Sequence, residues 1–219
     1  MSRIGLTRST APASSPCACD VKAEAARLVA AFRRVEPRFD PTAANAALLN
    51  SALAWVWRRD SLNQLGLDYR KGLLLHGPLG VGKSLTLMAL RKYMVDVFDR
   101  VPAMRGDYRL KAWLATASEL ANAYAADGQP ALMPYAAADV NLVVDELGRE
   151  PRPAKYYGTE LNVLQFLLQL RYDHRHTSVT HATTNMELSQ LAARYGDFVA
   201  DRAIEMFNFV EVSGTSKRK

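Results

Sequence analysis

Two short segments contain residues whose types and spacing could perform chemistry. Residues 77–84 (GPLGVGKS) fit the pattern G-x-x-x-x-G-K-[ST]. Residues 142–148 (LVVDELG) place Asp145 and Glu146 side by side at the end of an apolar run. A glycine-rich loop with a lysine can surround phosphate groups, and paired carboxylates can handle a metal ion and a proton. The two segments together predict phosphate chemistry.

The loop residues have separate predicted roles. Gly77, Gly80 and Gly82 let the backbone curl so that its N–H groups point toward phosphates. Lys83 is expected to reach the β- and γ-phosphates, and the Ser84 hydroxyl to ligate Mg²⁺. An apolar strand before the loop and a helix after it make a chance glycine turn a poor explanation. We therefore expect a nucleoside triphosphate to bind here, in contact with Gly77, Pro78, Leu79, Gly80, Val81, Gly82, Lys83 and Ser84.

The acidic pair and a later amide complete the predicted site. In a P-loop protein, a second strand ends in an acid that holds Mg²⁺ through water, and Asp145 suits that role. Glu146 could polarise the water that attacks the γ-phosphate, which favours hydrolysis over transfer to a bound acceptor. A solvated acid without a role is the alternative for Glu146. Asn185 follows an expected strand, where its amide could hydrogen-bond the attacking water or the γ-phosphate.

Strands that alternate with amphipathic helices must position these residues. Such alternation implies an α/β fold with a parallel sheet covered on both faces. The expected strands are 72–76, 110–115, 140–145, 178–183 and 208–212. The expected helices are 83–98, 118–126 and 161–174, with helical turns through 203.

The chain before this alternation divides into two parts. Residues 1–19 are rich in Ser, Ala, Thr and Pro and contain no acid, which predicts a flexible arm. Residues 20–70 are expected to be helical, with Asp20 capping one helix and a second helix beginning near Pro41. Trp55 and Trp57 flank the apolar stripe of that second helix, as packing or partner-contact residues. Residues 71–219 form the predicted nucleotide-binding core.

Composition limits the classes of protein that remain. The chain of 219 residues is 49% hydrophobic, enough for one main domain, and no apolar run approaches the roughly 20 residues that span a bilayer. Only two cysteines occur, Cys17 and Cys19, and their spacing suits neither a mutual disulfide nor a zinc site. We therefore expect a soluble, cytoplasmic protein without membrane contact.

The net charge of +6 is concentrated in the N-terminal third, with 11 basic and 6 acidic residues up to Lys71. It is compatible with contact to nucleic acid and equally with ordinary solubility.

With these residues placed, the chain resembles the AAA+ ATPases, and within them the DnaC-type helicase loaders and the IstB-type transposition helpers. The resemblance extends over about 39–212 and rests on GPLGVGKS, LVVDELG and the run from Thr184, TNMELSQLAARYGDFVADRAIEM. It implies a P-loop fold with a five-stranded parallel sheet, a short helical N-terminal region, and a C-terminal lid that is absent or truncated. It also implies ATP and Mg²⁺ as cofactors.

The resemblance assigns further residues. Asn185 matches the first sensor, and Arg202 matches the arginine finger, which acts on the nucleotide of a neighbouring subunit. A finger supplied in this way implies self-association into a head-to-tail ring or spiral. Arg194 is the nearest competitor, and a local salt bridge to an adjacent acid is the alternative for Arg202. The second sensor is unassigned, with Arg218 as a candidate.

The implied function is ATP hydrolysis coupled to loading of a replicative helicase, with an IstB-like ATPase that assists transposition as the alternative. The partner would be a replicative helicase or a transposase, contacted through residues 20–70. Single-stranded DNA could bind the loop after the acidic pair, which combines basic and aromatic residues, although such a loop could also be merely solvated. Those residues are Arg149, Arg152, Lys155, Tyr156 and Tyr157.

Two other classes remain open. A P-loop small-molecule kinase would need an acceptor pocket and an arginine-rich lid, for which the segment Met104–Arg109 is short. A nucleotide-binding scaffold without turnover is disfavoured by the intact Lys83, Asp145 and Glu146.

Overall fold

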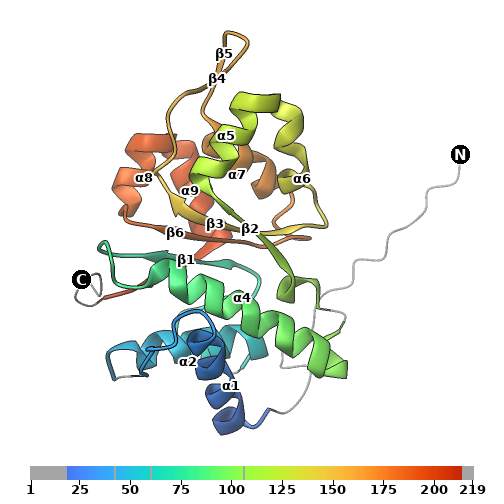
Figure 1. The fold of residues 1–219 in the computed structure, drawn as a ribbon, viewed down its shortest axis with the longest axis vertical. Helices are drawn as coiled ribbons and strands as arrows, with labels where there is room; N and C mark the ends of the chain where they lie inside the picture. The colour runs from blue at the N-terminus through green and yellow to red at the C-terminus, as the bar shows by residue number, and fades with distance from the viewer. Residues whose placement is uncertain (1–18, 42, 60, 106, 214–219) are drawn as a thin grey trace, which may run out of the picture.

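Five apolar strands form one parallel sheet in the computed structural model, which describes residues 19–213 except 42, 60 and 106 (Figure 1). The strand order is β2-β3-β6-β1-β7, and every neighbouring pair is parallel. The strands are β1 (Gly72–His76), β2 (Ala112–Thr116), β3 (Asn141–Leu147), β6 (Thr180–Thr184) and β7 (Phe207–Glu211). The predicted α/β fold with a five-stranded parallel sheet is confirmed.

Alternating side chains on the strands build a hydrophobic core on each face of the sheet. On β1, Leu73 and Leu75 join one cluster while Leu74 joins the other. On β3, Val143 likewise faces away from Val144. Because both faces are buried, the strands are almost continuously apolar, which is typical of a parallel sheet covered by helices.

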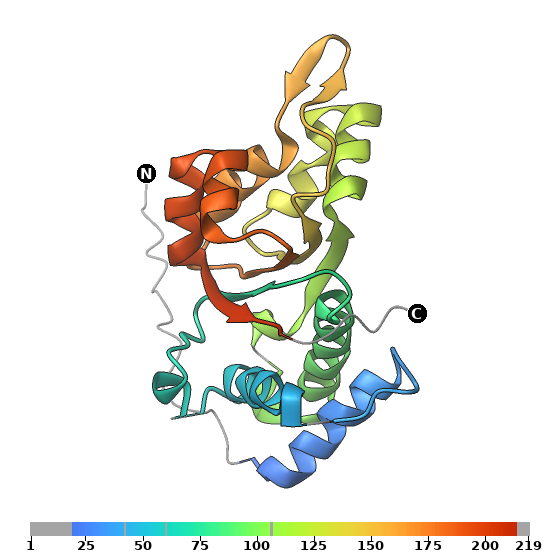
Figure 2. The ribbon, with the colours of Figure 1, turned by 90° about the vertical axis from the view of Figure 1, so that its left-hand side faces the viewer.

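One face of the sheet is covered by the helix after the P-loop and by the N-terminal helices (Figures 1 and 2). These are α1 (Val21–Arg33), α2 (Ala43–Trp57), the single turn α3 (Ser61–Gln64) and α4 (Lys83–Arg100). As predicted, Asp20 caps α1, since its side chain accepts hydrogen bonds from the backbone N–H groups of Lys22 and Ala23.

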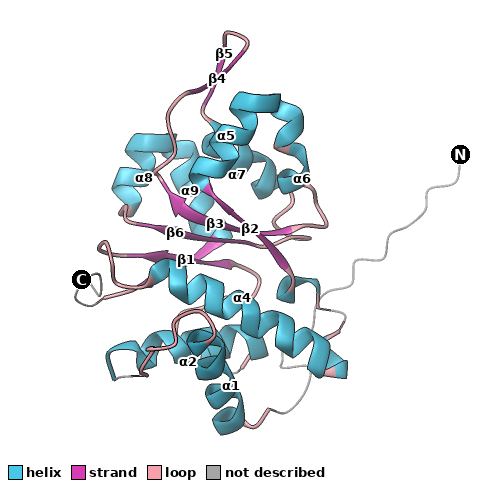
Figure 3. Cartoon of the chain, viewed as in Figure 1, coloured by secondary structure: helices cyan, strands magenta, loops and turns pink. Residues whose placement is uncertain are grey.

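The opposite face is covered by the remaining helices, as the colouring by secondary structure shows (Figure 3). These are α5 (Ala117–Asp127), α6 (Met133–Ala136), α7 (Val163–Asp173), α8 (Leu188–Tyr195) and α9 (Asp197–Met206). Short 3-10 turns connect elements at Pro102–Met104, Tyr108–Leu110 and Gln129–Ala131. The turn at Tyr108–Leu110 explains why β2 begins at Ala112 rather than at residue 110, as the sequence suggested.

The N-terminal helices share one core with α4. The indole of Trp57 donates to the hydroxyl of Tyr93 at 2.8 Å, and that hydroxyl donates to the carboxylate of Glu24 at 2.7 Å. The indole of Trp55 donates to the carbonyl of Lys71 at 2.8 Å. Both tryptophans are 2% exposed, so they are packing residues and not partner-contact residues.

A short antiparallel hairpin replaces the loop expected after the acidic pair. It consists of β4 (Ala154–Tyr156) and β5 (Thr159–Leu161) and projects beyond the helices, away from the sheet (Figure 1). Its turn residues Tyr157 and Gly158 both have positive φ, the geometry that a tight two-residue hairpin turn requires. Leu161 therefore ends β5, and the following helix begins two residues later than predicted, at Val163.

A buried arginine secures the amino ends of β3 and β6. Arg171 is 1% exposed and donates to the carbonyls of Val140 and Val179 and to the hydroxyl of Thr180. Burial lowers the pKa of Arg171 to about 10. Because the carbonyls satisfy its donors, the guanidinium fixes where the two strands start.

No helix in the described part of the chain combines the length and the apolar character needed to cross a bilayer.

The buried His181 predicts a dependence of stability on pH. Burial lowers the pKa of His181 to about 3, and the charge of Arg171 contributes to the shift. An unfolded histidine has a pKa of about 6.5, so below that pH the unfolded chain binds a proton that the folded chain refuses. The free energy of unfolding should fall by up to about 1.4 kcal/mol per pH unit as the pH decreases from about 6.5 toward 3.

Urea unfolding between pH 7.5 and 5 measures this slope before most carboxylates titrate. His181→Asn offers a matched control, since its side chain can still accept the hydrogen bond that Nδ1 of His181 receives from the N–H of Leu73. The variant should show a flatter profile, and equal slopes in the two proteins would contradict the assignment.

Candidate functional site

The P-loop connects β1 to α4, as the sequence predicted. Gly77 has φ of 140°, and a Cβ at this position would lie 2.4 Å from the carbonyl oxygen of Val212. Gly82 has φ of 97° and is the N-cap of α4. No other residue type would fit at Gly77 without displacing the backbone of Val212, the residue that follows β7, so the conformation of the loop requires glycine here.

Lys83 begins α4 and is 7% exposed. Its ammonium group donates to the carbonyls of Gly77 at 2.7 Å and Pro78 at 2.6 Å. The same end of α4 presents unsatisfied backbone N–H groups and the positive end of the helix dipole. A lysine and a helix N-terminus thus converge on one small volume, which favours an anionic ligand.

A pocket of about 220 Å³ lies between the P-loop and the carboxyl ends of β3 and β6. It is lined by Leu79, Gly80, Gly82, Lys83, Ser84, Leu85, Glu146, Thr183, Thr184 and Asn185. The structure therefore brings Glu146 and Asn185 together with most of the predicted loop residues. Among the residues that the sequence nominated, Gly77, Pro78, Val81, Asp145 and Arg202 do not line this pocket.

Thr183 connects Asp145 and Glu146. Its hydroxyl donates to the carboxylate of Asp145 and accepts from the backbone N–H of Glu146 at 2.9 Å. Asp145 is 6% exposed, so this hydrogen bond satisfies a buried charge. Glu146 has φ of 59°, and the pairing of β3 with β6 is irregular between Val144 and Leu147. At this irregularity the two consecutive acids point in different directions. Asp145 contacts Thr183 on β6, and Glu146 lines the pocket.

The carboxylate of Glu146 forms an ion pair with a basic neighbour. Nη1 of Arg149 lies 3.0 Å from Oε1 of Glu146, and both side chains are partly exposed. An exposed ion pair of this kind is weak. The carboxylate can therefore exchange Arg149 for another partner at little cost.

Asn185 is exposed at the end of β6, next to a fixed turn. The hydroxyl of Thr184 donates to the carbonyl of Leu147 at 2.8 Å and accepts from the N–H of Met186 at 3.1 Å. These bonds hold the backbone on both sides of Asn185, so its amide projects from a rigid support toward the P-loop.

The two arginines considered for the finger role differ in what they contact. Arg194 donates from Nη2 to the carbonyl of Glu150 at 2.6 Å and lies 3.1 Å from its carboxylate. Arg202 lies on α9 and, among the described residues, forms no ion pair, so the alternative of a local salt bridge is wrong. Its guanidinium carbon lies 3.6 Å from the ring centroid of Phe198. Arg194 is a structural residue here, whereas Arg202 has no anionic partner within the part of the chain that the structure describes.

A cluster around Glu150 was missed in the sequence. The carboxylate is 3% exposed and accepts from the hydroxyl of Tyr195 at 2.6 Å and from the N–H of Gly148 at 2.9 Å. Burial raises the pKa of Tyr195, and the Glu150 charge raises it further. The cluster binds the segment after the acidic pair to α8. Arg194 and Tyr195 lie 44 and 45 residues after Glu150, so the sequence gives no local signal that the three side chains meet.

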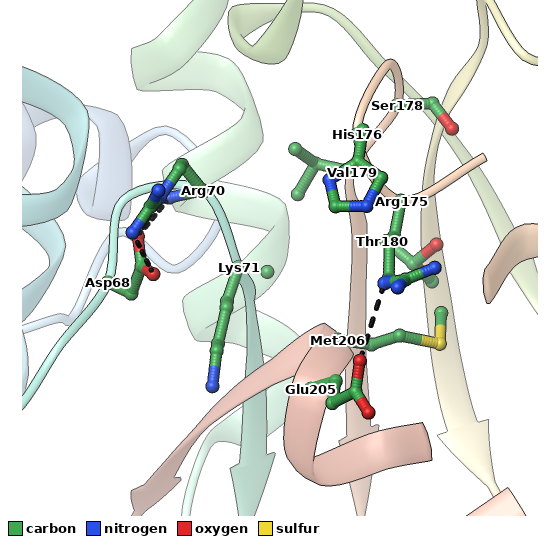
Figure 4. A pocket seen from close by; sticks show the side chains of 11 residues that line it. Asp68, Arg70, Lys71, Arg175, His176, Ser178, Val179, Thr180, Glu205 and Met206 are labelled. Carbon is green, nitrogen blue, oxygen red and sulfur yellow. Dashed lines mark hydrogen bonds and ion pairs between the residues drawn. The ribbon is translucent and has the colours of Figure 1, made fainter. Parts of the chain in front are cut away.

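A second pocket, of about 240 Å³, lies at the opposite, amino-terminal edge of the sheet (Figure 4). Its charged side chains are largely paired with one another, Arg70 with Asp68 at 3.1 Å and Arg175 with Glu205 at 3.5 Å. Such pairs leave little net charge for a ligand, and none of the predicted site residues lies here.

The chain was compared with protein families, curated proteins and solved structures. No protein-family model matches the chain. A segment of 82 residues is 33% identical to an AAA-ATPase of Arabidopsis thaliana and covers 35% of this chain but only 15% of that protein.

Among solved structures, the DnaC helicase loader aligns with a TM-score of 0.55 at 19% identity, over 82% of this chain and 96% of that chain. A primosome component from Streptococcus pyogenes serotype M3 aligns with a TM-score of 0.56 at 20% identity, over 91% and 100%. AMPPCP-bound DnaA from Aquifex aeolicus aligns with a TM-score of 0.51 at 16% identity, over 80% and 48%. The chain thus shares the fold of these solved structures, and the predicted resemblance to DnaC extends to its structure.

Removing the Thr183 hydroxyl should separate its role in positioning the acids from simple packing. Thr183→Val keeps the shape of the side chain but leaves the Asp145 carboxylate without its donor, which should cost about 1–3 kcal/mol of unfolding free energy. We also expect any nucleotide hydrolysis to need more Mg²⁺. Thr183→Ser retains the hydroxyl and should restore the wild-type Mg²⁺ requirement. An unchanged requirement in the valine variant would show that Thr183 does not position Asp145.

Proposed function

We propose that the protein binds and hydrolyses ATP and acts in the cytoplasm as a DnaC-like loader of a replicative helicase. One observation carries the proposal: the P-loop with Lys83 and Ser84 shares a single pocket with Glu146 and Asn185. A site with these groups can both hold a triphosphate and direct water at it.

Binding would use the loop backbone and two side chains. The N–H groups of the loop and the end of α4 would surround the β-phosphate, while Lys83 would leave the carbonyls of Gly77 and Pro78 for phosphate oxygens. Mg²⁺ suits the donors present, because Ser84 lines the pocket and Thr183, which also lines it, donates to the Asp145 carboxylate. When bound, Mg²⁺ would neutralise charge that develops on the phosphates.

Hydrolysis would depend on three side chains. Glu146 would accept a proton from the attacking water once it releases Arg149. The amide of Asn185 would hydrogen-bond that water or the γ-phosphate. Arg202 of a neighbouring copy would stabilise the charge of the transition state, which requires the copies to associate head to tail.

The choice of a helicase loader draws on the comparisons. Two of the solved structures that this chain covers almost completely are a DnaC helicase loader and a primosome component. A role as an IstB-like ATPase in transposition uses the same site and is the second candidate. In either case, the helical region 20–70 is the surface we propose for the protein partner.

A small-molecule kinase is less compatible with the structure. The segment that would have to act as a lid is packed: Met104 is 0% exposed, and Arg109 is buried against Asp107 at 2.6 Å. A buried, ion-paired arginine is not available to close over an acceptor.

Glu146→Gln tests the proposed hydrolysis. The amide retains the size of the side chain but cannot accept a proton, so turnover should fall by about 100-fold or more while ATP still binds. Phosphate release and nucleotide binding are measured side by side, with the exposed Asp127→Asn as a control for loss of one negative charge. Undiminished turnover in Glu146→Gln would remove Glu146 from the mechanism.

The hairpin β4–β5 offers a surface for single-stranded DNA. Tyr157 at its tip is 93% exposed and packs edge-on against Tyr156. Lys155 on the same strand forms an exposed ion pair with Glu160 at 2.7 Å, a weak interaction that leaves it able to contact another anion. Exposed aromatic rings next to cations can stack on bases and contact phosphates. Tyr157→Ala should therefore weaken binding of a single-stranded oligonucleotide by about five-fold or more.

Fluorescence anisotropy at several salt concentrations measures this binding, with Trp113→Ala as the control. Trp113 is also aromatic and 50% exposed but lies on β2, far along the chain from the hairpin. Equal losses in both variants would argue against a specific role of the hairpin.

Partner choice is tested by pull-down with the replicative helicase and with a transposase of the same host, with ATP and without it. Retention of the helicase supports the loader, and retention of only the transposase would favour the second candidate.

A further inference from the structure

Two aromatic rings hold the guanidinium of Arg202. Its central carbon lies 3.6 Å from the ring centroid of Phe198, one turn earlier on α9, and 4.3 Å from that of Tyr172 on α7. Among the described residues, it has no carboxylate partner, although Asp201 adjoins it and Glu205 lies on the same helix. Stacking on two rings, and not an ion pair with a described residue, therefore holds the charged group of Arg202.

Glu205, the acid that is hydrogen-bonded to Tyr172, is occupied by other groups. Oε2 of Glu205 accepts from the hydroxyl of Tyr172 at 2.9 Å. The same oxygen pairs with Nε of Arg175 at 3.5 Å, as Figure 4 shows. The guanidinium of Arg175 also lies over the Tyr172 ring, at 3.9 Å from its centroid. Glu205 and Arg175 thereby fix the ring of Tyr172, and they leave Arg202 without a counter-charge.

This kind of contact suits an arginine that must meet an anion elsewhere. Stacking uses the face of the guanidinium, whereas its N–H donors lie around the edge and remain available to planar or tetrahedral anions. A salt bridge would instead occupy those donors. Phe198 is 55% exposed, and a large apolar side chain at the surface is explained if it supports the arginine beside it.

We infer that Phe198 and Tyr172 are positioning residues that hold Arg202 extended toward the γ-phosphate bound by a second copy of the chain. The inference rests on the proposed role of Arg202 and adds the side chains on which that role depends. Neither ring lines the pocket of its own subunit, so their effect should be felt only in the neighbouring site.

The first experiment compares steady-state ATP hydrolysis in variants of one ring. Phe198→Leu keeps an apolar side chain without a ring and should lower turnover about three- to thirty-fold. Phe198→Trp restores an aromatic face and should recover most of the activity. Ile204→Ala, on the same helix and 47% exposed, controls for loss of apolar surface and should lose less than Phe198→Leu. Arg202→Ala should lose on the order of a thousand-fold.

The second experiment asks which subunit carries the defect. Arg202→Ala subunits, which have an intact pocket, are mixed with Lys83→Ala subunits, which contribute an intact Arg202. The rate of ATP hydrolysis by the mixture should exceed the sum of the rates of the two variants measured separately. The same mixture is made with the double variant Lys83→Ala/Phe198→Leu as the donor of the finger. We expect this donor to rescue several-fold less.

The outcomes separate the inference from the proposed function. Equal rescue by both donors, or full activity of Phe198→Leu beside an impaired Arg202→Ala, would overturn the positioning role and leave the finger in place. Absence of any rescue by Lys83→Ala would overturn the finger and the positioning role together. Circular dichroism and ATP binding by each variant establish that it is folded.

Discussion

Parallel pairing of β6 with both β3 and β1 is the constraint on which the candidate site depends. The register places Leu75 opposite Thr183 and Val144 opposite Ala182, so Thr183 stands between the strand that leads into the P-loop and the strand that carries the acids. Its hydroxyl then reaches Asp145 and the backbone of Glu146. A shift by one residue would turn Thr183 to the other face and leave the Asp145 carboxylate buried without a donor.

The sequence predicted the parts of the site whose signals are local, and missed those created by contacts between distant residues. GPLGVGKS and its flanking elements follow from short-range spacing, and the five strands follow from apolar runs. The hairpin at 154–161 has short, polar strands, and its packing of Tyr156 against Tyr124 joins residues 32 positions apart. The roles of Thr183 and Glu150 likewise depend on which strands and helices become neighbours, which a single sequence does not specify.

The basic residues of this chain are used in distinct ways, and the net charge of +6 conceals this. Arg171 is buried among carbonyl groups, Arg58 and Arg109 share the carboxylate of Asp107, and Arg194 is tied to Glu150. These cations hold the fold together and cannot contribute to binding of an anion. Arg202 differs because aromatic faces support it and its donors meet no carboxylate in the described part of the chain.

The shared core of α4 and the N-terminal helices has a mechanical consequence. Helix α4 has 18 residues, so it is a rod about 27 Å long. One end is the P-loop turn at Lys83, and the other end carries Arg100, which lies 2.8 Å from the carboxylate of Glu24 on α1. Hydrogen bonds also join Tyr93, near the middle of α4, to Trp57 on α2 and Glu24 on α1. We therefore expect the three helices to move as one body. A tilt of a few degrees at the P-loop end would therefore displace the N-terminal helices by a distance that grows with the length of α4.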